Sequence, residues 1–214
     1  MNLSVSSHPI VRVLVSRLRN RDTDSATFRH IVTELTTLLI VEALADLSLV
    51  DEPLLTPLGP TTGARPACPI VFVPILRAGL GMAEASARLL PEAPICHLGL
   101  YRDEETLQPV TYYDRVPHHG LEQAITVLLD PMLATAGTAT AAIDVVRRHG
   151  AADIRFVGLI GAPEGVAALT EAHPDTRIFL AALDERLTTS DDPFPPGYIW
   201  PGLGDAGDRQ FGTR

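Results

Sequence analysis

The stretch "ITVLLDPMLATAGTATAAIDVV", residues 125–146, holds the signals of a strand, an acid, a turn and a helix in one run. Four of its first five residues are apolar, as in a strand buried on both faces of a sheet. Asp130 follows at the carboxyl end of that strand, and after a Thr/Gly/Ala turn a helix is expected to open at Thr138. In an open α/β sheet, ligands bind outside the carboxyl ends of the strands. The run therefore predicts an α/β fold with a ligand site beside Asp130.

The turn in this run has the composition of a phosphate loop. Thr135, Ala136, Gly137 and Thr138 would present successive backbone N–H groups, and two hydroxyls, to an anion at the helix N-terminus. A carboxylate such as Asp130 is useful beside that anion only for gripping sugar hydroxyls or a metal ion. From spacing alone, a plain βα turn with a Thr helix cap explains these residues equally well.

Short apolar runs alternate with helical patterns around this stretch, which predicts a parallel sheet with helices on both faces. We expect strands at "IVFVPI", "ICHLGLY", "ITVLLD", "IRFVGLIGA" and "RIFLAAL". Helices are expected over 78–90, 138–149 and 164–172, and a long amphipathic helix over 24–49. The chain of 214 residues fits a single domain, 1–214.

Three segments break this alternation. The Pro-, Gly- and Thr-rich stretch 52–69 is expected to be a connection. The β-formers in "RDEETLQPVTYYDRVPHHG" predict a projecting hairpin, or arm, over about 101–120. The tail over about 188–214 holds too much Pro and Gly for a helix or a central strand, so it is expected to be a structured loop or a disordered end.

Composition excludes several classes of function. The net charge of −9 argues against a sequence-independent grip on nucleic acid. All 17 basic residues are Arg, which excludes a Walker A loop and a Schiff-base lysine. The longest run without a charged residue, 131–143, is shorter than the roughly 20 residues of a membrane span, so no membrane partner is expected. We find no secretion signal, which makes the cytoplasm the default location.

The run "GLGDAG", residues 202–207, matches the G-x-G-x-x-G dinucleotide fingerprint letter for letter. A working fingerprint follows a strand, opens a helix and has an acid about 20 residues later. This run follows Trp200 and Pro201 in the turn-rich tail, and only seven residues come after it. We therefore expect it to meet none of the three requirements, which argues against NAD binding.

Residues 130–138, "DPMLATAGT", resemble the phosphoribosyl-diphosphate loop of type I phosphoribosyltransferases, in the form found in the uracil-specific branch. "VPILRAGLGM", "LYRDEETLQPVTYY", "APEGVAAL" and "GYIWPGLGDAGDRQFGT" resemble further segments of that family in the same order. The resemblance implies a parallel sheet flanked by helices, a hairpin arm and a C-terminal hood that binds the nucleobase. It also implies the conversion of uracil and 5-phospho-α-D-ribose 1-diphosphate (PRPP) to UMP and diphosphate.

The resemblance assigns roles to individual residues. The catalytic set that it implies is Arg77, Arg102, Asp130 and Asp205. The PRPP site is expected to include these four together with Pro131, Met132, Leu133, Ala134, Thr135, Ala136, Gly137 and Thr138. Uracil is expected to meet Ile199, Gly204, Asp205 and Ala206. Mg²⁺ is the implied cofactor, held mainly through PRPP and water with no direct protein ligand.

The chain departs from the family pattern at several positions. Arg186 replaces a common Gly, Trp200 replaces an aliphatic residue, and 188–196 looks longer than usual, which could alter base affinity. Ala136 stands where Gly is frequent, which matters only if that position needs a positive φ.

Two functional alternatives stay open beside the implied reaction: a regulator that kept the fold and senses a nucleotide, and a transferase for another nucleobase. The acidic charge balance weighs against a regulator that binds RNA or DNA. The long apolar helix points to a homodimer or a higher homo-oligomer. GTP as an allosteric activator is a possibility on which the residues are silent.

Overall fold

The computed structural model describes residues 2–102, 109–117 and 119–213. Its centre is a sheet with the strand order β1 (Leu3–Val5), β10 (Arg177–Leu183), β9 (Asp153–Gly161), β7 (Ile125–Leu129), β4 (Ile70–Leu76), β5 (Leu98–Arg102) and β6 (Pro109–Asp114). The short β8 (Met132–Leu133) also pairs with β9. All neighbours in the sheet are parallel except β5 and β6. The predicted parallel sheet is confirmed.

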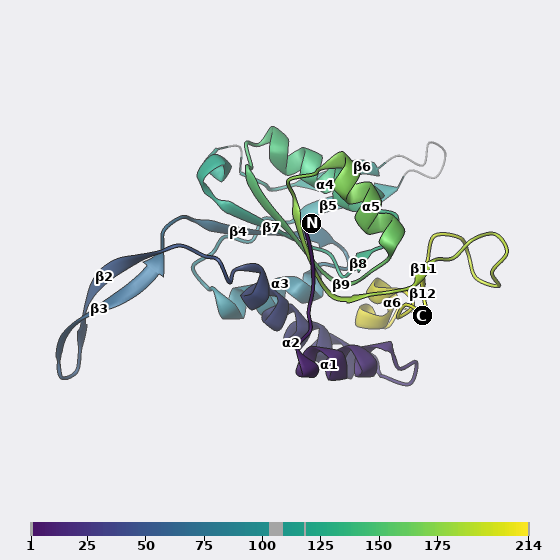
Figure 1. The fold of residues 1–214 in the computed structure, drawn as a ribbon, viewed down its shortest axis with the longest axis horizontal. Helices are drawn as coiled ribbons and strands as arrows, with labels where there is room; N and C mark the ends of the chain where they lie inside the picture. Colours follow the sequence, from purple (N-terminus) through teal and green to yellow (C-terminus); the bar gives the residue numbers. More distant parts are fainter. Residues whose placement is uncertain (1, 103–108, 118, 214) are drawn as a thin grey trace.

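Helices cover both faces of the sheet (Figure 1). One face carries α1 (Pro9–Arg19), α2 (Ser25–Ala43) and α3 (Leu80–Leu89), and the other carries α4 (Gly137–Arg148) and α5 (Pro163–Ala172). Neighbouring strand residues serve different cores: Val127 packs with α1 to α3, whereas Leu128 packs with α4 and α5. This two-faced burial explains why the strands read as unbroken apolar runs. The four predicted helices are confirmed, although α2 already ends at Ala43.

The strand order sets the place of a ligand site. β4 lies between β5, which follows it in the chain, and β7, which comes after β5. The chain therefore moves to one side of β4 and then returns to the other, and β4 and β7 flank the point where the direction changes. Ligands bind at the carboxyl ends of the strands at such a switch point. The turns that follow β4 and β7 carry Arg77 and Asp130.

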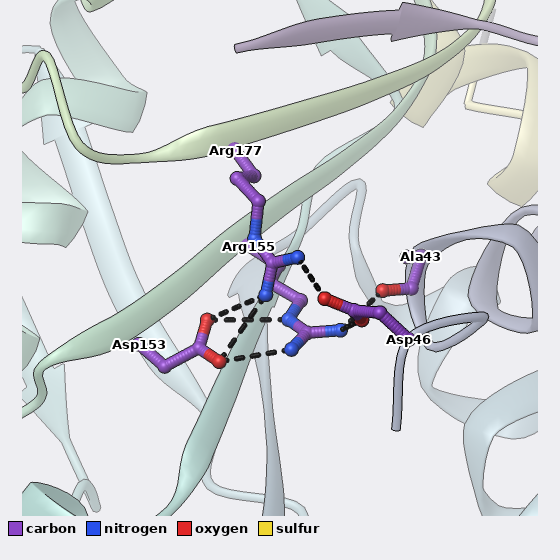
Figure 2. Close-up of polar contacts among 5 residues, drawn as sticks. All are labelled: Ala43, Asp46, Asp153, Arg155 and Arg177. Atoms are coloured by element: carbon purple, nitrogen blue, oxygen red, sulfur yellow. Dashed lines mark hydrogen bonds and ion pairs between the residues drawn. The ribbon is translucent and has the colours of Figure 1, made fainter. Parts of the chain in front are cut away.

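A network of paired charges closes the opposite, amino end of the sheet (Figure 2). Arg155 is only 2% exposed and donates to Asp153 at 2.8 Å, to Asp46 at 2.7 Å and to the Ala43 carbonyl at 2.5 Å. Arg177 donates to Asp153 at 3.1 Å and also to Asp46. Burial favours a higher pKa for Asp153, but hydrogen bonds and charge from the two guanidinium groups outweigh it and lower that pKa. The network joins the carboxyl end of α2 to β9 and β10.

The segment expected to be a plain connection is a β-hairpin, so that expectation is wrong. β2 (Leu49–Thr56) pairs antiparallel with β3 (Gly59–Pro66), and the hairpin projects from the body of the molecule (Figure 1). Pro53 and Pro60 lie inside these strands. Both strands of a two-stranded hairpin are edges, where a residue without an N–H group is tolerated.

The tail also contains regular structure that its composition did not predict. β11 (Arg186–Leu187) pairs with β12 (Ile199–Trp200), and α6 (Ala206–Phe211) follows. The "GLGDAG" run therefore follows a two-residue strand and opens a short helix, contrary to the expectation that it would do neither. No strand follows α6 as far as the last described residue, 213, so the run is not part of a βαβ unit.

Candidate active site

Asp130 directly follows the fully buried strand β7, at the carboxyl edge of the sheet. One carboxylate oxygen accepts a hydrogen bond from the Met132 N–H group at 3.3 Å. No cation among the described residues forms an ion pair with Asp130. Burial raises the pKa of this carboxyl to about 7, and the single hydrogen bond offsets only part of that rise. Asp130 therefore carries a charge that the surrounding protein does little to stabilise.

The predicted phosphate loop leads from Asp130 into α4. Pro131 and Leu133 are buried and hold the loop against β9 through their carbonyl groups, whereas Thr135, Gly137 and Thr138 are exposed. The partly buried Met132 and Ala134 pack against the core beside α1 to α3. The exposed side of the loop is thus the side that a ligand can reach.

The N-terminus of α4 has no side-chain cap. Its N-cap residue is Ala136, in the left-handed region with φ +65°, and no side chain hydrogen-bonds to the first turn. The alternative of a turn capped by Thr is therefore wrong. The first N–H groups of a helix have no partner within it, so an anion can receive them here. The positive φ also shows why Gly is frequent at this position.

Arg77 lies in the turn after β4, exposed to solvent, and no ion pair of its guanidinium is present in the part of the chain that the structure describes. Gly79 in the same turn packs closely on β7: a Cβ atom there would lie 2.5 Å from the Leu129 carbonyl oxygen. Only Gly fits so near the backbone of a neighbouring strand. The Arg77 turn thus packs against the residue that precedes Asp130, and the two loops lie side by side.

The arm is confirmed as an antiparallel pair of β5 and β6, with Arg102 opposite Pro109. The tip of the predicted arm, 103–108, lies outside the described residues, and so does the side chain of Arg102. The backbone of Arg102 is at the carboxyl end of β5, the strand beside β4. Because β4 and β5 are parallel, Arg102 lies at the same carboxyl edge of the sheet as Arg77.

The residues predicted to meet uracil gather where β12 leads into α6. Ile199 and Ala206 are buried, whereas Gly204 and Asp205 are exposed. Asp205 is also the N-cap of α6, because its carboxylate accepts a hydrogen bond from the Asp208 N–H group at 2.8 Å. This structural role was not visible in the sequence.

Two charged residues that the sequence did not single out hold this loop in place. Asp184, which is 8% exposed, accepts a hydrogen bond from the Gly202 N–H group at 2.8 Å. Arg19 donates to the Gly202 carbonyl at 2.8 Å and forms a two-pronged ion pair with Asp184. Both backbone groups of Gly202 are therefore fixed by one partly buried ion pair. Arg19 and Asp184 are 165 positions apart, so no local signal could have joined them.

The departures at Arg186, Trp200 and the long segment form one cluster. The Arg186 guanidinium pairs with Asp192 through two hydrogen bonds of 2.8 Å and lies 6.0 Å from the centre of the Trp200 ring. The Phe194 ring packs beside Trp200, with 5.9 Å between ring centres. The three departures thus stabilise one another beside the predicted base loop, residues 199–206.

Comparison with known proteins gives the same family over nearly the whole chain. The model of the family described as uracil phosphoribosyltransferase matches residues 5–213. A uracil phosphoribosyltransferase of Roseiflexus castenholzii is 50% identical over 209 residues, covering 98% of this chain and 97% of the relative. One of Streptococcus pneumoniae is 48% identical over 213 residues, covering 99% of each chain.

Solved structures agree with this assignment. The AQ2163 protein of Aquifex aeolicus has a TM-score of 0.89 at 38% identity, covering 98% of this chain and 97% of that one. The adenine phosphoribosyltransferase of Trypanosoma brucei has a TM-score of 0.57 at 13% identity over 91% of this chain and 89% of that one, a likeness of fold alone. With a family model that spans 5–213 and relatives about half identical over their full length, this chain belongs to the uracil phosphoribosyltransferase family.

Proposed function

We propose that PRPP and uracil meet at the carboxyl edge of the sheet, between the turns after β4 and β7 and the C-terminal tail. There the chain converts uracil and PRPP to UMP and diphosphate, the activity of its family. This placement rests on a set of polar groups that have neither an ion pair nor a helix cap among the described residues. The Arg77 guanidinium, the Asp130 carboxylate and the first turn of α4 all lie at this edge and form no ion pair or cap with described residues.

PRPP presents three features that these groups can bind. Its 5-phosphate fits the uncapped first turn of α4, with the hydroxyls of Thr135 and Thr138 as additional donors. Its ribose hydroxyls can donate hydrogen bonds to Asp130. Its diphosphate suits the planar, two-pronged guanidinium groups of Arg77 and Arg102.

In the reaction, the bond between C1′ of the ribose and the diphosphate oxygen breaks, and N1 of uracil bonds to C1′ as its proton leaves. The sugar passes through a cationic state while the leaving group gains negative charge. Arg77 and Arg102 stabilise that negative charge, and Asp130 holds the ribose in place. The chain needs no covalent nucleophile, because positioning and electrostatic stabilisation lower the barrier.

The residues at this edge suit Mg²⁺ bound through the substrate. Mg²⁺ keeps several waters and is held by one or two carboxylates together with substrate phosphates. Among the described residues, no group of three or more His, Cys, Asp or Glu side chains is placed to form an all-protein cage, and Asp130 supplies a carboxylate beside the phosphate loop. When bound, the ion would neutralise charge on the diphosphate.

Uracil is chosen as the base because the relatives are named for it. In the tail, backbone C=O and N–H groups of Ile199 and of 204–206 can match the alternating acceptors and donors along one edge of uracil. Asp205, exposed at the start of α6, can also face the ribosyl side. Pro201 and the glycines let the chain approach a flat ring.

Cytosine tests this assignment. It differs from uracil at two neighbouring positions, where an N–H becomes a bare ring nitrogen and a carbonyl becomes an amino group. Two backbone groups would lose their partners together, each at a cost of about 1–3 kcal/mol. We expect kcat/KM for cytosine to be lower by about 10⁴-fold or more, whereas 5-fluorouracil, unchanged at both positions, should be accepted. Comparable turnover of cytosine would refute the backbone recognition of the base.

The proposal includes a single catalytic domain and a homodimer or higher homo-oligomer. Exposed apolar side chains on the outer surface of α1 and α2, among them Val13 and Val41, support association. No helix among the described residues is long and apolar enough to cross a membrane. The cytoplasmic location stays a prediction from the sequence, and the residues are silent on GTP as an activator.

A further inference from the structure

Gln210 lies in α6, and its side chain reaches the turn that carries Arg77. Among the described residues of the tail, it is the only fully buried one that does so. It is 0% exposed. Its amide nitrogen donates to the Ala78 carbonyl at 2.9 Å and to the Ala206 carbonyl at 3.2 Å. One side chain therefore joins the helix that follows the base loop to the turn that carries Arg77.

The contact continues through that turn to Asp130. Ala78 lies between Arg77 and Gly79, and Gly79 packs on the Leu129 carbonyl, one residue before Asp130. The base loop, the diphosphate arginine and the ribose acid are thus in continuous contact. The hydrogen bond from Gln210 to the Ala78 carbonyl is the contact that joins the tail to this series.

The surrounding structure leaves room for this amide. A Cβ atom at Gly81 would lie 1.8 Å from the Gln210 side-chain oxygen, so any larger residue at 81 would displace it. The main-chain carbonyl of Gln210 accepts a hydrogen bond from Arg29 at 2.6 Å, which fixes the end of α6 against α2. Gln210 is therefore held through its side-chain nitrogen and, separately, through its main-chain carbonyl.

The same amide is unfavourable for stability. Its oxygen is buried and finds no hydrogen-bond partner among the described residues. A buried acceptor without a partner destabilises a fold, and an apolar side chain of the same size would avoid that cost. Polar groups that stability alone would not select are typical of sites where function needs them.

We propose that Gln210 is a positioning residue for the transfer reaction: it fixes the base loop relative to the Arg77 turn, so that uracil N1 faces C1′ of PRPP. It touches neither substrate. The inference rests on the proposed placement of uracil and PRPP. Misplacement of reacting groups by about 1 Å can lower a rate by about 10²-fold.

Gln210→Leu keeps the bulk of the side chain and removes both hydrogen bonds. We expect kcat to fall by about 10- to 100-fold in a protein that still unfolds cooperatively, because the variant removes the unpartnered amide oxygen while it leaves the Ala78 carbonyl without a donor. Thr36→Val is the matched control, because it removes another hydrogen bond of a fully buried side chain, from Thr36 to the Val32 carbonyl at 2.7 Å. It should leave kcat and both KM values within about twofold of the wild type.

Gln210→Glu supplies a second readout that a purely structural role would not give. A carboxylate cannot donate to the Ala78 carbonyl, whereas a protonated carboxyl can. We expect the ratio of the variant's kcat to that of the wild type to rise as the pH falls from about 8 to about 6, since burial raises the pKa of a carboxyl. Asp130 titrates in the same pH range and is present in both proteins, so the ratio removes its contribution.

The outcomes separate this inference from the site assignment. A folded Gln210→Leu protein with wild-type kcat and KM overturns the positioning role. If that variant does not fold, a flat pH ratio for Gln210→Glu overturns it instead. Asp130→Asn serves as the reference: if it too keeps wild-type kinetics, the site assignment itself is wrong, and the role of Gln210 is rejected with it.

Discussion

Two aspartates at opposite ends of the central sheet differ in how their charge is satisfied: Asp153 at the amino end and Asp130 at the carboxyl end. At the amino end, Arg155 and Arg177 share Asp46 and Asp153, and every one of these four groups has a partner (Figure 2). At the carboxyl end, Asp130 is half-buried and forms no ion pair with described residues, and burial raises its pKa to about 7. The difference shows where charge serves the fold and where it is kept for a ligand.

Pairing explains the contrast in pKa. Both Asp153 and Asp130 are partly desolvated, but two guanidinium groups keep the pKa of Asp153 low, while Asp130 has one backbone hydrogen bond. A charge satisfied within the protein has little left to offer a substrate. A charge that is not satisfied destabilises the free protein and can be compensated when a ligand binds.

The largest expected effect on stability is at the amino end. Arg155→Met should lower the free energy of unfolding by about 2–4 kcal/mol, because it removes the hydrogen bonds of a buried guanidinium to two half-exposed carboxylates and leaves the Ala43 carbonyl without its donor. Denaturant unfolding measures the loss. At temperatures where the variant is folded, kcat and KM should be unchanged, since the network lies at the far end of the sheet from the site.

Arg88→Met is the control for that experiment. Arg88 forms an exposed ion pair with Glu84 one helical turn away, and such pairs contribute about 0.5 kcal/mol or less. Two results would contradict the assignment of the amino-end charges to stability and of the carboxyl end to ligand binding. One is an equal loss of stability in the two variants, and the other is an altered KM for PRPP in folded Arg155→Met.

A smaller effect of opposite sign is expected at the carboxyl end. Asp130→Asn should raise the free energy of unfolding by on the order of 1–3 kcal/mol at pH 8, because a neutral amide replaces a desolvated carboxylate. The folded pKa, about 7, is above the ordinary aspartate value of 3.8, so the contribution of Asp130 to stability falls as the pH rises from about 4 to 7. The gain in melting temperature should therefore shrink as the pH is lowered toward 5. A lower melting temperature at pH 8 would contradict this.

The smallest effect concerns the phosphate loop. Ala136→Gly relieves a positive φ but removes a buried methyl group, and each change is worth about 1 kcal/mol with opposite sign. We expect stability within about 1 kcal/mol of the wild type and an unchanged KM for PRPP. Ala136→Val, with a β-branched side chain at the same φ, should be clearly less stable. Thermal unfolding of the wild type and the two variants measures the order of their melting temperatures. If the Val variant is as stable as the wild type, the positive φ at residue 136 does not strain the backbone.

Much of the fold was predictable because its strands are buried on both faces. Val127 and Leu128 belong to different cores, so the run that contains them is apolar throughout and easy to recognise. The β2–β3 hairpin was missed for the opposite reason. Its residues are mostly exposed and include prolines, so neither hydrophobic periodicity nor a typical turn signal marked it as paired strands.

The site divides in the same way between local and long-range signals. Residues 130–138 are contiguous, and strand, acid, turn and helix follow in an order that has a direct physical meaning. The supports of the base loop are not contiguous: Arg19 meets Asp184, and Gln210 meets Ala78 across 132 positions. Nothing in the neighbouring residues marks such partners, because their roles depend on how distant segments pack.

The central claim is that the carboxyl end leaves Asp130 without an ion-pair partner among the described residues and keeps its carboxylate for the ribosyl donor. The most direct test is kcat/KM for PRPP in purified, folded Asp130→Asn at pH 8. We predict a fall of about 10²- to 10³-fold relative to the wild type, as for the loss of one preorganised group that holds the reacting sugar. A folded variant with unchanged kcat/KM for PRPP would remove Asp130 from the site and contradict the account.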